Sequence, residues 1–194
     1  MKIASAWSGH DCSFCIMDNG SPVVHAEYER YIREKEPAGD SVQFMFDKYD
    51  ECDDIKYFAT NYPVKKLEQH PESLKKLQEI IKKNNGEIFA IGHHQAHAAN
   101  TFFSSNYDEA LILTIDGGGV ETNRGDVTAC TAWKGKDNKI EHIHTFPASV
   151  VNIGQIWTRS TRYIFGLQSG WPRGHQAGTV MAMAAIGDRT KYCD

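Results

Sequence analysis

The chain has 194 residues, of which 41% are hydrophobic and 24% charged, so it holds enough apolar material for a core and is not a disordered segment. Its formal net charge is −4 and its Lys and Arg residues are dispersed, which argues against nucleic acid as a partner. No apolar run approaches the roughly 18 residues that span a bilayer, and we expect no signal sequence, no membrane partner and a cytoplasmic location.

The first half of the chain has the pattern of one α/β unit. Residues 2–7, 12–18 and 22–29 have strand patterns, and the short turns between them predict a three-stranded antiparallel meander. The elements expected next alternate as parallel β/α units do: a helix at about 41–51, a strand at 55–60, a charged helix at about 71–84 and a strand at 87–91. A helix over 94–104 is expected to complete this unit.

A second unit of the same kind begins at residue 110. The elements expected in it are a strand at 110–115 that ends at Asp116, strands near 126–134 and at 139–146 around a turn at 135–138, and helices at about 152–165 and 175–186. Because no further strand pattern follows, we expect a first unit at 1–107 and an incomplete second unit at 108–194. Two such units in succession predict an α/β fold of the actin/hexokinase/Hsp70-like (ribonuclease H-like) kind.

Two histidines at the start of the expected helix have the spacing of a metal-binding pair. His93 and His97 are four residues apart and therefore share one helix face, whereas His94 points about 100 degrees away and is expected to pack or to support the site. Asp116 follows the next strand, which brings the chain back beside the histidines. Two imidazoles and a carboxylate suit a divalent metal, Fe(II) first and Mn(II) or Zn(II) as alternatives, with positions left open for water or substrate.

Three glycines follow this aspartate. Backbone amides of Gly117, Gly118 and Gly119 can approach phosphate oxygens closely, so we predict that they contact a nucleotide while Asp116 holds the cation. The structural alternative is that the His-rich helix start is only a polar end packed on the sheet.

Five segments of the sequence carry a resemblance to a known family. They are SGHDCSFCIMDNG at 8–20, EYERYIREKEP at 27–37, HHQAHAANTFFSSNYDEALILTIDGGGVE at 93–121, NIGQIWTRSTRYIFG at 152–166 and VMAMAAIG at 180–187. Together they resemble the NodU/CmcH-type carbamoyltransferases, and they span nearly the whole chain. One departure is that Ala177-Gly178-Thr179 stands where the family usually has Glu-Gly-Lys, so two charged groups are lost.

The resemblance implies a fold, a reaction and a set of partners. It implies the N-terminal part of a domain related to the tRNA threonylcarbamoyl-transferase catalytic subunit, normally followed by a C-terminal YrdC-like domain, which we expect this chain to lack. That second domain would make carbamoyl adenylate from carbamoyl phosphate and ATP, and the first would pass the carbamoyl group to an acceptor hydroxyl. The metal ligands that it implies in this chain are His93, His97 and Asp116. A second polypeptide or a C-terminal region would then be needed for activity.

His10 is our candidate catalytic base. It falls in the turn between the first two expected strands, where this superfold faces the phosphate and acceptor end of its cleft. A neutral imidazole can accept the proton that an acceptor hydroxyl loses as it attacks a carbonyl. The alternative is a turn histidine bonded to a neighbouring backbone carbonyl. Asp11 either faces the substrate and orients His10 or closes the turn as an Asx residue.

The charged run after the third expected strand has two interpretations. Such a run is usually a solvated face, but the resemblance makes a substrate- or phosphate-facing role for Arg30 or Arg33 an equal alternative.

Two other functions compete with O-carbamoyl transfer. One is an enzyme acting on tRNA adenosine, as the threonylcarbamoyl enzymes do, although the acidic charge argues against it. The other is a non-catalytic metal- or nucleotide-binding subunit, or a truncated relic.

Overall fold

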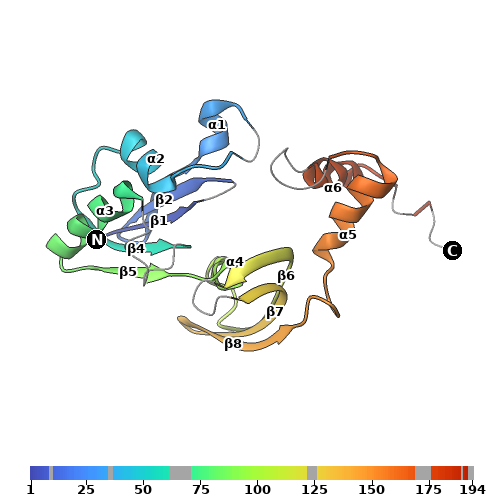
Figure 1. Ribbon diagram of the computed structural model, residues 1–194. Coiled ribbons are helices and arrows are strands. Elements are labelled where there is room, and N and C mark those ends of the chain that lie inside the picture. Colours follow the sequence, from blue (N-terminus) through green and yellow to red (C-terminus); the bar gives the residue numbers. More distant parts are fainter. Residues whose placement is uncertain are drawn as a thin grey trace. The chain divides into compact units, whose positions relative to one another are not determined.

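The computed structural model describes residues 1–8, 11–34, 37–61, 71–121, 126–168, 176–188 and 190–191 (Figure 1). They form two compact units, Met1–Ala96 with Val120–Asp126 and His97–Gly119 with Val127–Asp194. The boundary crosses helix α4 (His93–Phe103) and strand β6 (Glu109–Glu121), so each of these two elements contributes residues to both units. The division after residue 107 that the sequence suggested stays a prediction.

A five-stranded sheet is the framework of the first unit, with strand order β3-β2-β1-β4-β5. Its strands are β1 (Lys2–Trp7), β2 (Ser13–Asp18), β3 (Ser21–Glu27), β4 (Ile55–Thr60) and β5 (Glu87–Ala90). The first three pair antiparallel as a meander, while β4 pairs parallel with β1 and β5 pairs parallel with β4. The expected meander followed by parallel β/α units is therefore present.

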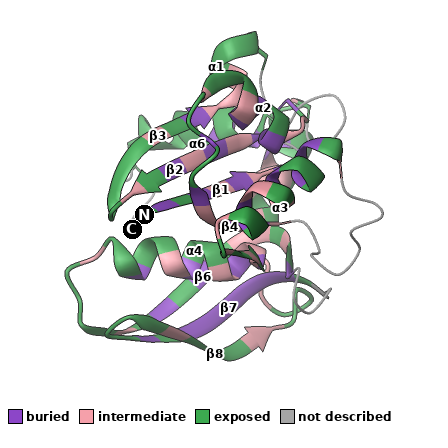
Figure 2. Ribbon diagram, turned by 90° about the vertical axis from the view of Figure 1, so that its left-hand side faces the viewer, coloured by how far each residue is buried: buried purple, intermediate pink, exposed green. Residues whose placement is uncertain are grey.

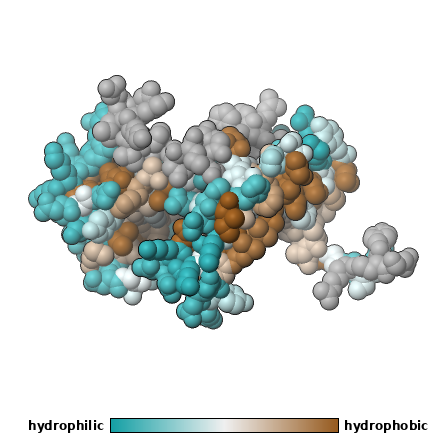
Figure 3. Space-filling view, turned by 90° about the horizontal axis from the view of Figure 1, so that it is seen from below, coloured by the Kyte–Doolittle hydropathy of each residue, from teal (hydrophilic) through white to brown (hydrophobic). Residues whose placement is uncertain are grey.

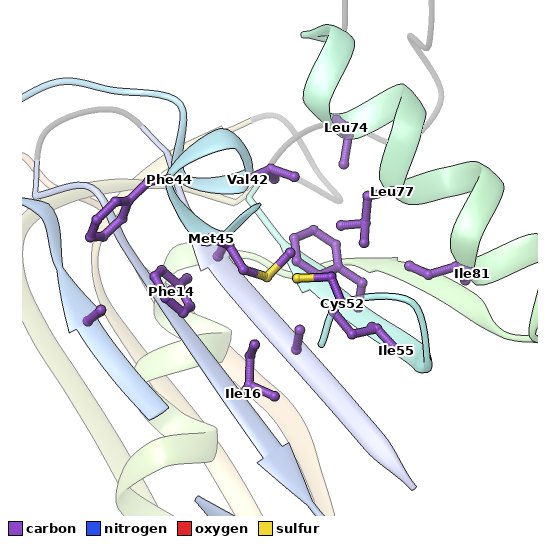
Figure 4. Packing of buried hydrophobic residues seen from close by; sticks show 14 of the residues in the cluster. Phe14, Ile16, Val42, Phe44, Met45, Cys52, Ile55, Leu74, Leu77 and Ile81 are labelled. Carbon is purple, nitrogen blue, oxygen red and sulfur yellow. The ribbon is translucent and has the colours of Figure 1, made fainter. Parts of the chain in front are cut away.

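Helices α2 (Ser41–Lys48) and α3 (Glu72–Lys83) supply the other half of this unit's core. Alternate residues of β1 and β2 are buried, which is the pattern of a sheet with one face against helices. Figure 4 shows the side chains of both helices pointing toward those of the strands. The labelled residues are Phe14, Ile16, Val42, Phe44, Met45, Cys52, Ile55, Leu74, Leu77 and Ile81.

The third strand is shorter than the sequence predicted. It ends at Glu27, and Tyr28–Ile32 form a short helix, α1, instead of continuing to residue 29 as a strand. The backbone N–H of Tyr28 donates to the carbonyl of Cys12 (2.8 Å), which ties the start of α1 back to the meander. The charged and aromatic residues of this segment are compatible with a strand or a helix, so strand propensity alone did not determine where β3 ends.

A three-stranded sheet with strand order β6-β7-β8 is the framework of the second unit. It contains β6, β7 (Asp126–Lys136) and β8 (Lys139–Phe146). Helix α4 lies on one face of it, where Ala98 and Phe102 pack against Ile112 and Trp133. In Figure 2 most of β7 is coloured as buried, as expected for the central strand.

The strand that carries Asp116 is longer than expected. We predicted that it would end at Asp116, but β6 continues through the three following glycines to Glu121. Glycine allows this extension, since Gly118 has φ +151, a value that side-chain-bearing residues rarely adopt. The glycines are therefore part of a sheet strand.

The remaining elements described in the second unit are helices. Helix α5 (Gly154–Arg159) runs into a π-helical turn, Ser160–Ile164, and α6 (Ala177–Ala185) follows. None of the described helices has the length and apolar composition needed to cross a membrane. Apolar side chains are nevertheless present at the surface (Figure 3), among them Leu111, Leu113 and Ile115 of β6.

Candidate metal centre

Helix α4 starts shortly after strand β5 ends. The chain leaves β5 at Ala90, Gly92 is buried, and the helix begins at His93. The backbone N–H of Ala96 donates to the carbonyl of Gly92 (2.9 Å), which closes the first turn. The two predicted ligand histidines therefore lie in the first turns of α4, as the sequence indicated.

The side chain of His93 rests against an aromatic ring. Its imidazole meets the indole of Trp7 edge to face, with ring centroids 5.4 Å apart. His94 is fully buried and its ring centroid lies 5.3 Å from that of His93, so it packs behind the site, as expected for this residue. These contacts limit the orientations available to the His93 ring.

Asp116 presents one carboxylate oxygen to the histidines. Its Oδ1 accepts a hydrogen bond from the backbone N–H of Gly117 (2.6 Å), and its Oδ2 lies 3.6 Å from Nε2 of His97. The side chain of Asp116 is 37% exposed and that of His97 55% exposed. The carboxylate is thus fixed on one side and open to solvent on the other.

One ligand atom each from His93, His97 and Asp116 lies within 4.8 Å of the other two. Two ligands bound to the same ion at about 2.1 Å can be at most about 4.2 Å apart. Small side-chain rotations would therefore bring all three atoms onto one cation. Two imidazoles and a carboxylate, partly exposed, fit a divalent transition metal with open coordination positions. Metal binding itself stays a prediction.

The three predicted phosphate-binding glycines lie beside this group within β6. The N–H of Gly117 is directed at Asp116, and Asn152 Nδ2 donates to the carbonyl of Gly117 (3.4 Å). A Cβ on Gly154 would lie 2.1 Å from the Gly117 nitrogen, so the backbone at the start of α5 packs directly on β6. Contact of Gly117, Gly118 and Gly119 with phosphate stays a prediction.

His10, the predicted base, lies outside the described residues. Its neighbour Asp11 is exposed and has a left-handed backbone, φ 57, which aspartate tolerates in turns. This conformation suits a residue that closes the turn. Ser8, on the other side, is held by Asn61, which accepts from the Ser8 N–H (3.1 Å) and donates to its carbonyl (2.9 Å).

Arg30 and Arg33 lie at the surface around α1. Arg30 is paired with Glu27 (2.9 Å) and Glu29 (3.4 Å), and its hydrogen bond to Glu27 raises the pKa of the guanidinium. Arg33 ends α1 in the left-handed conformation, φ 63, and its N–H donates to the carbonyl of Glu29. The contacts described for both fit the solvated-face alternative, and neither belongs to the cluster around His93.

Two residues at this centre received no role from the sequence. Glu121 is buried, and its Oε1 accepts a hydrogen bond from the backbone N–H of His94 at 2.7 Å. Gly154 allows α5 to approach Asp116 and Gly117. Neither role could be read from the sequence, because each depends on a contact with a segment that is distant along the chain.

The fold is that of the actin-like, ribonuclease H-like ATPases. The crystal structure of HypF from T. kodakarensis superposes with a TM-score of 0.51 at 16% sequence identity, over 75% of this chain and 18% of that one. The fold class predicted from the order of elements is therefore confirmed.

The sequence matches the family described as carbamoyltransferase N-terminus over residues 68–192, and the chain belongs to that NodU/CmcH-type family. It is 29% identical over 108 residues to the nodulation protein NolNO of Sinorhizobium fredii, covering 55% of this chain and 14% of that protein. It is 36% identical over 77 residues to the "probable carbamoyltransferase HypF" of Methanocaldococcus jannaschii, covering 38% of this chain and 10% of that protein. The chain thus spans a small part of the length of these relatives.

Proposed function

We propose that this chain is the metal-binding component of an O-carbamoyltransferase. The observation that supports this most directly is the convergence of His93, His97 and Asp116 in a member of a carbamoyltransferase family. A divalent cation held there, Fe(II) first and Mn(II) or Zn(II) as alternatives, would polarise carbonyl or phosphate oxygens. Gly117, Gly118 and Gly119 are proposed to contact the nucleotide phosphates.

The proposed reaction moves a carbamoyl group from carbamoyl adenylate to an acceptor hydroxyl. The acceptor oxygen forms a bond to the carbamoyl carbon, the bond from that carbon to the adenylate oxygen breaks, and AMP leaves. The hydroxyl proton goes to a base, for which His10 is our candidate. Carbamoyl phosphate and ATP are the proposed sources of the adenylate, made by a YrdC-like domain on a second polypeptide or a C-terminal region. The cytoplasmic location stays a prediction.

A reconstitution experiment tests this function. The chain is mixed with a YrdC-like domain, Fe(II), carbamoyl phosphate, ATP and a panel of hydroxyl-bearing acceptors, and pyrophosphate and carbamoylated product are followed. We expect product only when chain, metal and YrdC-like domain are all present, and none with Asp116→Asn. Product formation that is unaffected by Asp116→Asn or by omission of the chain would contradict the proposal.

A further inference from the structure

The residue that precedes helix α4 cannot supply a capping side chain. The first N–H groups of any helix have no partner within the helix and are usually met by Ser, Thr, Asp or Asn just before it. Here the preceding residue is Gly92, which has no side chain. The start of the helix that carries His93 and His97 therefore depends on a group from elsewhere.

Glu121 supplies that group from 27 residues away. Its side chain is 1% exposed, and Oε1 accepts from the backbone N–H of His94 at 2.7 Å. A carboxylate accepting from a helix N-terminus makes a charge-assisted hydrogen bond and also faces the positive end of the helix dipole. These interactions offset the cost of burying the charge.

The same strand also carries the acidic ligand candidate. Asp116 and Glu121 are both in β6, five residues apart, and the strand is continuous between them. At one position β6 presents a carboxylate oxygen to His97, and at the other it holds the first turn of the helix on which both histidines lie. A shift of α4 along or around its axis would break the Glu121 contact.

We infer that Glu121 is a positioning residue for the metal centre, which fixes the start of α4 so that His93 and His97 meet Asp116. This inference rests on the proposed metal site. Glu121 need not touch the cation, because outer residues that orient metal ligands commonly change metal affinity by about 10- to 100-fold.

Three variants of the purified chain test the inference by titration with Mn(II), monitored by the electron paramagnetic resonance of free Mn(II). Glu121→Leu keeps the volume of the side chain but cannot accept a hydrogen bond. Glu121→Gln keeps an acceptor oxygen. Glu109→Leu removes the same charge from the other end of β6, where Glu109 is half-exposed and pairs with Lys134 (3.0 Å).

We expect Glu121→Leu to weaken Mn(II) binding by about 10-fold or more, while Glu121→Gln and Glu109→Leu bind within a few-fold of the unmodified chain. Glu121→Leu should also speed hydrogen exchange of the His94 amide. If Glu121→Leu binds Mn(II) as tightly as the unmodified chain, the inference is wrong and the metal site stands. If the unmodified chain binds no Mn(II), both the positioning role of Glu121 and the proposed metal site are wrong.

Discussion

The two carboxylate oxygens of Asp116 make different contacts. Oδ1 is occupied by the N–H of the next residue, which fixes the rotamer, and Oδ2 faces His97 at 3.6 Å. A carboxylate held in this way is oriented before any ligand arrives, so a cation would bind without much loss of side-chain entropy.

Single substitutions of the ligand candidates should therefore be costly for metal binding. We expect Asp116→Asn and His97→Gln each to weaken Mn(II) affinity by more than about 10-fold, since each removes a direct ligand. His144→Gln is the matched control, because His144 is exposed on β8 and lies outside the cluster. Calorimetric titration measures all three, and equal affinities for His97→Gln and His144→Gln would rule out His97 as a ligand.

The sequence predicted those features of the site that depend on residues close together along the chain. The four-residue spacing of His93 and His97 fixes their common helix face, and an acid after the next strand could be expected nearby. The role of Glu121 could not be predicted, because its partner is a backbone N–H 27 residues away that no side-chain pattern reveals. Contacts of this kind depend on how elements pack.

Elements with a strong periodic pattern were predicted closely. The strands at 2–7 and 55–60 have the expected bounds, and the helix expected at 71–84 is α3, Glu72–Lys83. The prediction was wrong for β6, whose glycines lower strand propensity but fit into the sheet.

The close approach of α5 to β6 makes Gly154 a sensitive position. A Cβ there would lie 2.1 Å from the Gly117 nitrogen and 2.3 Å from the Asp116 carbonyl carbon, so one of the two backbones must move. We expect Gly154→Ala to lower the free energy of unfolding by about 1–3 kcal/mol and to weaken Mn(II) binding as Asp116 shifts. Urea denaturation measures the first effect.

Gly178 is the matched control for that substitution. It lies in α6, where a Cβ would meet nothing within 4 Å. Gly178→Ala should therefore be neutral or stabilise by up to about 1 kcal/mol, because alanine is the better helix former. An equal effect of the two substitutions would contradict the packing of α5 on β6.

On the scale of the molecule, the core of the first unit contains two thiols that make stability depend on pH. Burial, reinforced by the charge of Asp40, raises the pKa of Cys12 to about 11 from its usual 9.0. Burial also raises the pKa of Cys52 to about 11. The unfolded chain loses these protons at lower pH than the folded chain. The stability that the two protonated thiols contribute is therefore fully present below about pH 9 and is lost between about pH 9 and pH 11.

Chemical denaturation at pH 8 and pH 10 checks this dependence. One pKa unit corresponds to about 1.4 kcal/mol and each thiol contributes close to one unit over this range, so the two thiols together should lower the free energy of unfolding by roughly 2.5 kcal/mol at the higher pH. A Cys12→Ala, Cys52→Ala double variant should lose less stability between the two pH values, whatever its starting stability. The same loss in both proteins would show that other groups cause it.

The order of two α/β units was predictable from the sequence because hydrophobic periodicity repeats along the chain. The compact units of the structure divide within α4 and β6, and this division depends on contacts between distant segments. These two elements also carry the three ligand candidates, His93, His97 and Asp116.

Anomalous diffraction from crystals grown anaerobically with Fe(II) tests the proposed metal centre most directly. The expected result is one iron peak within about 2.0–2.3 Å of a ring nitrogen of His93, a ring nitrogen of His97 and a carboxylate oxygen of Asp116. Iron bound elsewhere, with these three side chains uncoordinated, would contradict the proposed metal centre.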